Sequence, residues 1–159
     1  MPGENNQSTM IEKISDYIKE QSCANVCCMD EFAKPYCFNC FYAYNAADQL
    51  LYYKSSTDTK HSGIVFNNPA IAGTILPDKL NKLQVRGLQF EGEVLSFNHP
   101  LCKGASAFYH KKNPVALAMP GEVWTIQINK LKLTDTALGF GKKLLWQRNE
   151  QHDNAVTSF

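Results

Sequence analysis

Short runs of apolar and aromatic residues, separated by turn residues, recur along this chain and limit the folds open to it. They span residues 22–29, 35–44, 50–53, 70–76, 83–97 and 122–133. Most of them are too short for helices and are bounded by Gly, Pro, Asn or Asp, as strands are. Many short strands with few helices between them favour a closed antiparallel barrel with helices at its periphery.

Three helical segments are expected around these strands. A capping box at Thr9-x-x-Glu12 precedes apolar residues at helical spacing and predicts a helix that ends near residues 20–22. A second, short helix begins near Thr59 and stops at Asn67-Asn68-Pro69. Residues 99–119 are moderately helical and are interrupted by Pro114.

A chain of 159 residues is the size of one domain. We expect a flexible N-terminus at residues 1–8, a single domain at residues 9–148 and a polar C-terminal tail at residues 149–159. The formal net charge is +1 with 19% charged residues, which argues against a nucleic-acid partner. No run approaches the roughly 20 apolar residues of a membrane span, and the N-terminus lacks an export signal, so a cytoplasmic protein without a membrane partner is expected.

Five of the six cysteines lie between Cys23 and Cys40, and without an export signal they are expected to be reduced. Cys37-Phe-Asn-Cys40 has the spacing of a redox pair or of half a zinc site. Side chains alternate across a strand, however, so thiols three residues apart point to opposite faces. We therefore expect structural cysteines and no metal site.

The segment from Leu50 to Pro69 changes character halfway. An aromatic and aliphatic strand is followed at Lys54–His61 by four hydroxyl residues, one Asp, two Lys and one His. Ser56, Thr57 or Asp58 is expected to cap the following helix, whose N-terminus attracts anions. A phosphate site is one interpretation of this corner, and an ordinary capped turn with solvated lysines is the other.

Together with residues 67–75, which read N-N-P-A-I-A-G-T-I, this block resembles the FMN-binding split-barrel superfamily that includes pyridoxamine 5′-phosphate oxidase. The resemblance to the small YhbP-type branch is closer and covers Ile11 to Arg148. It implies a mainly β fold, a six-stranded antiparallel split barrel with Greek-key topology. It also implies FMN as the cofactor, a homodimer with the flavin at the interface, and a small-molecule electron donor or acceptor.

The resemblance also assigns residues to the flavin. The phosphate role falls by position on Ser55, Ser56, Thr59, Lys60 and His61, and Lys54 is placed where a residue can approach the flavin ring. On the second strand Phe38, Asn39 and Cys40 face the ring and the ribityl chain, and Asn39 is expected to be buried against polar ligand groups. Gln89 is the candidate on the long fifth strand, with Arg86 and Gln84 as rivals.

The C-terminal block Thr134–Trp146, which contains G-F-G-K-K, resembles the corresponding block of the YhbP-type branch. It implies either contact with the partner's flavin or a turn that caps the barrel. The Arg and His pair that pyridoxamine phosphate oxidase uses near its C-terminus has no counterpart here, so that activity is not expected. No residue stands out as catalytic. The main functional hypothesis is therefore a flavin-dependent oxidoreductase, and the alternative is a non-catalytic flavin-binding or carrier module. A haem-binding barrel and a cysteine or zinc protein are less favoured hypotheses.

Overall fold

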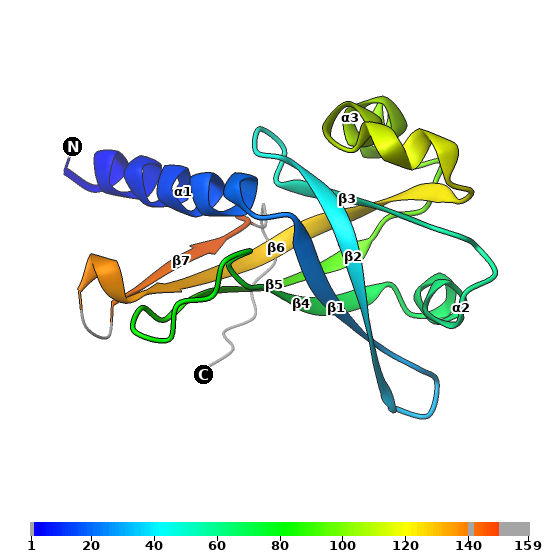
Figure 1. Ribbon diagram of the computed structural model, residues 1–159, viewed down its shortest axis with the longest axis horizontal. Coiled ribbons are helices and arrows are strands. Elements are labelled where there is room, and N and C mark those ends of the chain that lie inside the picture. The colour runs from blue at the N-terminus through cyan, green and yellow to red at the C-terminus, as the bar shows by residue number, and fades with distance from the viewer. Residues whose placement is uncertain (1, 140–141, 150–159) are drawn as a thin grey trace.

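One antiparallel sheet forms the centre of the computed structural model, which describes residues 2–139 and 142–149. The strands follow the order β3-β2-β1-β4-β5-β6-β7, and β3 also pairs with β6. Strands β1 to β6 therefore close into the six-stranded barrel that the sequence predicts (Figure 1). The strands are β1 (Cys23–Met29), β2 (Pro35–Asn45), β3 (Leu50–Ser55), β4 (Ala70–Ile75), β5 (Arg86–Val94), β6 (Glu122–Asp135) and β7 (Lys143–Gln147).

The first four strands have Greek-key topology. β1, β2 and β3 form an antiparallel meander, and β4 returns to pair with β1, which gives the spatial order β4-β1-β2-β3. The return connection from β3 to β4 contains α2 (Lys60–Asn67). The hydroxyl-rich corner after β3 is therefore part of the crossover connection of the Greek key.

Strand β6 is 14 residues long and is shared by two neighbours along one edge. Its residues 122–127 pair with β3 and close the barrel, whereas residues 130–134 pair with β7. Strand β7 is an addition to the six strands expected from the sequence. At the junction, Arg148 donates hydrogen bonds to the backbone oxygens of Ile128 (2.9 Å), Asp48 (2.9 Å) and Gln49 (3.2 Å). The Arg148 side chain, which follows β7, thus links the end of β7 to the turn before β3 and to β6 itself.

The first helix, α1 (Pro2–Glu20), closes one end of the barrel. It begins at Pro2, so the expectation that the helix starts at the Thr9 capping box was wrong. Its buried face packs on the barrel, where the Tyr17 hydroxyl donates to the Ile75 carbonyl (2.9 Å). The predicted tail lies, beyond Asn149, outside the described residues, as do Phe140 and Gly141 of the C-terminal block.

The second helix, α2, lies at the opposite end from α1 (Figure 1). The predicted helical character of residues 99–119 is confirmed by α3 (Ala105–Lys112), flanked by the 3-10 helices η1 (Pro100–Cys102) and η2 (Pro114–Ala118). A third 3-10 helix, η3 (Thr136–Leu138), follows β6.

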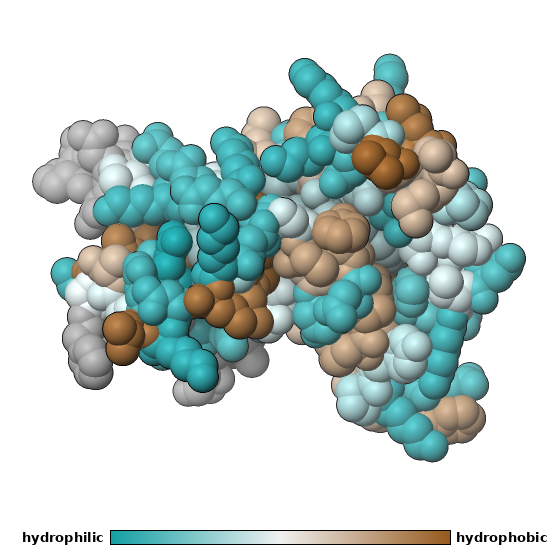
Figure 2. Space-filling view, viewed as in Figure 1, coloured by the Kyte–Doolittle hydropathy of each residue, from teal (hydrophilic) through white to brown (hydrophobic). Residues whose placement is uncertain are grey.

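The α3 segment covers the outside of the barrel at β2 and β3. Its Tyr109 packs with Tyr52 and Leu50, whereas Leu51 and Tyr53 on the other face of β3 belong to the main core. Both faces of β3 are therefore buried. In Figure 2 the surface over α1 is largely hydrophilic, and one of the groups of exposed apolar residues lies at the α3 end, where Val115 and Leu117 of η2 are exposed.

Gly92 lies at an irregularity of the long strand β5. The register between β5 and β6 shifts at Glu91/Gly92, and a Cβ atom at Gly92 would overlap the Gln127 carbonyl oxygen. Gly87, the other glycine of this strand, has only a side chain of Leu76 within contact range of such an atom. The close backbone approach is thus a property of Gly92.

Arg148→Ala tests whether the junction on β6 depends on the arginine. Removing a charged donor from three backbone oxygens is expected to lower the free energy of unfolding by about 2 kcal/mol. Lys143→Ala, which removes an exposed cation from the same strand region, serves as the control and should change stability little. Chemical denaturation of both variants measures this, and equal stabilities would show that the arginine contributes nothing at the junction.

Candidate functional site

The corner after β3 is built by its own hydroxyl groups. Thr59, the N-cap of α2, accepts a hydrogen bond from the Ser62 N–H at its side-chain oxygen (3.2 Å). The expectation that Ser56, Thr57 or Asp58 caps this helix was therefore wrong. Ser56 instead shapes the turn, because its carbonyl accepts from the hydroxyls of Ser62 (2.7 Å) and Thr59 (3.2 Å). Its own hydroxyl oxygen accepts from the Asp58 N–H (3.2 Å).

Gly121 holds this turn against the start of β6. Its φ of 125° lies in the region that favours glycine, and a Cβ there would stand 3.0 Å from the Ser55 carbonyl carbon. The Trp124 indole N–H donates to the Ser55 carbonyl oxygen (3.0 Å). The corner is thus fixed from both sides before any ligand binds, which is what an anion site requires.

The His61 ring occupies the inner side of the corner. It stacks on the Phe38 ring with centroids 3.8 Å apart and an interplanar angle of 12°. Its Nε2 atom lies 2.8 Å from the Ser55 hydroxyl oxygen. Burial lowers the pKa of His61, so the imidazole is neutral at pH 7.

Positive charge at the corner comes from the neighbouring lysine and from the helix itself. The Lys60 ammonium lies 4.6 Å from the centroid of the Tyr36 ring, and the Lys60 side chain is exposed. The first amides of a helix have no intrahelical partner, so those of Lys60 and His61 at the start of α2 are available to an anion. Ser55, Ser56, Thr59, Lys60 and His61 therefore lie together at this corner, and the Phe38 ring stacks on His61.

The edge of β2 next to this corner has free backbone groups. Hydrogen-bonded and non-hydrogen-bonded pairs alternate between β1 and β2, and the Tyr42 N–H donates to the Ser22 carbonyl oxygen. It follows that Cys37 and Asn39 direct their N–H and C=O groups away from β1. On that side β3 pairs with residues 42–45 only, and no other strand within the described residues pairs with Cys37 or Asn39. These peptide groups are open to a ligand.

The Asn39 side chain lies on the outer face of the barrel, in a row of polar side chains. It is exposed rather than buried, contrary to our expectation, and it accepts a hydrogen bond from the Asn25 amide (3.0 Å). The strand register continues the row from Asn25 to Thr74 on β4, Gln89 on β5 and Lys132 on β6. Gln89 is likewise exposed. The rivals of Gln89, namely Arg86 and Gln84, instead contact Asp135.

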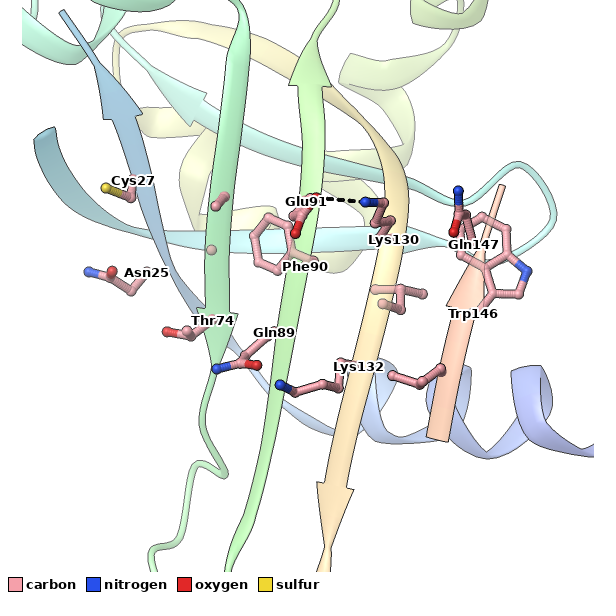
Figure 3. Close-up of a pocket in the computed structure, with 14 residues that line it drawn as sticks. Asn25, Cys27, Thr74, Gln89, Phe90, Glu91, Lys130, Lys132, Trp146 and Gln147 are labelled. Carbon is pink, nitrogen blue, oxygen red and sulfur yellow. Dashed lines mark ion pairs between the residues drawn. The ribbon is translucent and has the colours of Figure 1, made fainter. Parts of the chain in front are cut away.

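A cavity of about 780 Å³ lies over this outer face. Asn25 and Cys27 stand at one side, Thr74, Gln89 and Lys132 cross its floor, and Trp146 of β7 stands at the far side (Figure 3). An ion pair between Glu91 and Lys130 (3.5 Å) crosses the same floor. Sequence reasoning missed Asn25, Thr74 and Trp146. The alternation of Cys23, Asn25 and Cys27 with buried residues on β1 is the signal that points to the first of them.

Two of the predicted site residues lie apart from both the corner and the cavity. The Cys40 thiol points into the barrel, where burial raises its pKa to about 12. Lys54 points to the α3 side of β3, where its ammonium donates to the Ala116 carbonyl oxygen (2.7 Å) and lies 3.1 Å from the His110 Nε2 atom. In this structure neither residue is placed to contact a ligand at the corner.

Among residues 2–139 and 142–149, no group of three or more His, Cys, Asp or Glu side chains is arranged to hold a metal ion. Within the same ranges, no helix is long and apolar enough to cross a membrane.

The lowered pKa of His61 predicts that stability depends on pH. The unfolded chain takes up a proton near pH 6.5 while the folded corner resists it, so the free energy of unfolding should fall as the pH drops below 6.5. In His61→Gln this part of the slope should disappear. His99→Asn, which keeps a side-chain acceptor for the Leu101 N–H, should retain it. Urea denaturation between pH 7 and pH 5 measures the slopes, and identical slopes for all three proteins would exclude a buried neutral His61.

No family model matches the chain. Among solved structures, its fold is similar to a heme binding protein from Mycobacterium smegmatis, with a TM-score of 0.70, 11% identity and coverage of 89% of this chain and 57% of that one. It is also similar to a FAD-binding protein from Mesorhizobium loti, with a TM-score of 0.59, 15% identity and coverage of 76% of this chain and 90% of that one. A candidate pyridoxamine 5′-phosphate oxidase from Listeria innocua is similar too, with a TM-score of 0.59, 15% identity and coverage of 78% of this chain and 97% of that one. At these identities the likeness establishes the fold, which is the split barrel of the pyridoxamine 5′-phosphate oxidase type.

Curated relatives are closer in sequence. A UPF0306 protein of Photorhabdus laumondii is 38% identical over 113 residues, which cover 71% of this chain and 79% of the relative. The UPF0306 protein YhbP of Escherichia coli is 31% identical over 142 residues, which cover 89% and 96%. With the described fold, this similarity over most of both chains shows that the protein belongs to the UPF0306 family, to which YhbP belongs.

Proposed function

We propose that this protein binds FMN, with the phosphate at the corner between β3 and α2 and the ring along the free edge of β2. The observation that carries the proposal is the position of this edge. The open peptide groups of Cys37 and Asn39 lie on the same strand as Tyr36 and Phe38, which contact Lys60 and His61 of the corner. The candidate anion site therefore lies next to the free N–H and C=O groups of the β2 edge.

The phosphate end fits the residues present. The Lys60 ammonium and the first amides of α2 supply positive charge and N–H donors, and the Ser55 hydroxyl can donate to a phosphate oxygen. Thr59 and Ser56 contribute indirectly, because their oxygens already hold the turn. Neutral His61 carries no charge to the anion, but its position against Phe38 orients the start of the helix.

The ring end fits as well. Tyr36 and Asn39 are three residues apart on β2, which corresponds to about 10 Å along a strand. A ribityl chain spans such a distance and brings the pyrimidine portion of the flavin to the peptide groups of Cys37 and Asn39. The amides of Asn39 and Asn25 lie on the adjoining outer face. Gln89 stands farther along the same row and can complete the set of polar contacts.

A flavin held in this way would supply hydride transfer at its N5 atom, and the chain would bind and orient it. We propose an oxidoreductase that acts on a small molecule, in the cytoplasm, since the cavity beside β2 has room for one. No described side chain at the corner stands out as a general acid or base. A flavin-binding module without turnover is therefore the second candidate, and reduction of the bound flavin by a nicotinamide nucleotide followed by reoxidation with an acceptor would separate the two.

Haem and zinc are less well supported. The likeness to a heme binding protein is one of fold, and the Nε2 atom of His61 already contacts Ser55, so this nitrogen is not free to serve as an axial ligand in this arrangement. The cysteines within the described residues form no metal cluster with other ligands.

We further propose that two chains associate around the flavin. The cavity is open on the side away from the sheet, and Leu145 and Phe41 on the same outer face are 60% and 64% exposed. A second copy over this face would bury them and enclose the ring of the flavin. Sedimentation equilibrium with and without FMN tests this, and a monomer at micromolar concentration under both conditions would overturn it.

The first test of the proposed function is the visible spectrum of the purified protein during titration with FMN. A flavin spectrum with a saturable shift is expected. Lys60→Ala should raise the Kd about 10-fold or more, because a charged hydrogen bond to phosphate is lost. Lys82→Ala, which removes an exposed lysine from the loop between β4 and β5, should leave the Kd unchanged.

Riboflavin, which lacks the phosphate, provides the second arm of the experiment. It should bind more weakly than FMN to the wild type, and Lys60→Ala should remove most of that difference. Protein that neither carries nor takes up FMN would refute the proposal. If Lys60→Ala does not change FMN binding, the phosphate does not bind at this corner.

A further inference from the structure

The cysteines of the β1–β2 hairpin are sorted by the strand alternation into two sets. Cys28 and Cys40 point into the barrel, as the burial pattern of the two strands shows. Cys23, Cys27 and Cys37 point outward, and all six thiols of the chain are free. Cys37 and Cys40 thus lie on opposite faces, as expected from their spacing. The strand register, however, places Cys27 opposite Cys37, a pair that the sequence spacing does not indicate.

Cys27 and Cys37 stand directly opposite each other on neighbouring antiparallel strands. The Tyr42 N–H donates to the Ser22 carbonyl and the Asp30 N–H to the Lys34 carbonyl, so pairs with even numbers on this hairpin are the hydrogen-bonded ones. Cys27 and Cys37 therefore form a non-hydrogen-bonded pair, in which the Cα atoms are about 4.5 Å apart. Disulfides span Cα distances of about 4.4–6.8 Å, so the backbone already has the spacing of a bridge, at its short end.

The two thiols also contact each other. A hydrogen bond with the Cys37 side chain is the main reason why the pKa of Cys27 is raised above its ordinary value, with burial adding to it. By contrast, the third outward thiol, Cys23, stands opposite Phe41 and has no cysteine across the hairpin. The geometry thus singles out one pair among the outward cysteines.

Small molecules can reach this pair. Cys37 is exposed at the β2 edge, and Cys27 lies at the side of the outer cavity, beside Asn25 (Figure 3). Ala72 faces Cys27 from β4, so a short side chain leaves room above the thiol. Cys28 and Cys40, within the barrel, lack such access.

We infer that Cys27 and Cys37 form a thiol–disulfide exchange site that takes a low-molecular-weight disulfide as its oxidant. The Cys37 thiolate attacks one sulfur of the small disulfide, which gives a mixed disulfide and releases one thiolate. Cys27, after loss of its proton, attacks the Cys37 sulfur and releases the second. Two protein thiols are thereby oxidised to one cross-strand disulfide, and one small disulfide is reduced to two thiols. Because Cys37 is exposed, small thiols can reach the bridge and reduce it again.

This inference does not require a bound flavin and can be tested on the purified full chain. Incubation with glutathione disulfide should lower the number of thiols titrated in denaturant from six to four per chain, and dithiothreitol should restore all six. Cyanogen bromide cleavage after Met29 separates the two strands, so mass spectrometry should find the fragments carrying Cys27 and Cys37 joined unless they are reduced.

Single variants identify the bridge. Cys27→Ser should stop the reaction at a glutathione adduct on Cys37, and Cys37→Ser should give no bridge. The controls Cys23→Ser and Cys28→Ala should still form it. A bridge that survives Cys27→Ser, or wild-type protein that accumulates only glutathione adducts, would overturn the inference. A circular-dichroism spectrum of each variant confirms that the barrel is retained.

Discussion

The pairing of β3 with the first half of β6 is the constraint on which the rest of the structure depends. It converts an open sheet into a barrel, and it also determines where the chain leaves the sheet. Ser55 is paired with Glu122 at the last position of this contact, so the hydroxyl-rich turn begins where the barrel closes. Gly121 and Trp124, both next to that closure, then hold the turn in place.

A chain of aromatic contacts extends this dependence from the corner into the core. His61 stacks on Phe38, Phe38 lies against Tyr53, and Tyr53 stacks on Trp124 with centroids 6.1 Å apart. Phe66 of α2 also contacts the Trp124 ring, with centroids 5.0 Å apart. The start of α2 is therefore fixed on the barrel, because the side chains that position it contact residues of the core.

Strand periodicity and turn residues were sufficient to predict the barrel, its six strands and the helix at the corner. They were not sufficient to orient β2, because this strand is apolar on both faces and a shift of one residue exchanges the faces without changing the pattern. Asn39 was for that reason expected to be buried, whereas the assignment of Cys40 to the ligand came from the resemblance. Lys54 was expected near the flavin, but its side chain lies on the face of β3 that α3 covers. The local sequence around Lys54 does not indicate that contact.

The N-terminal part of α1 and the cap of α2 were missed for other reasons. Residues 2–8 are polar and resemble a loose terminus by composition. At the corner, Ser56, Thr57, Asp58 and Thr59 are all good capping residues, so sequence preference cannot choose among them. The choice of Thr59 follows from where the barrel contact ends, which is a property of the tertiary fold.

The free edge of β2 has a consequence for the behaviour of the protein in a crowded solution. Peptide groups that no strand satisfies are a template for a further strand, whether from another protein or from a second copy of the same chain. Cys37 and Asn39 present such groups on a hairpin that projects beyond β3. A molecule bound along this edge would therefore also determine whether the sheet ends within one chain or continues into another.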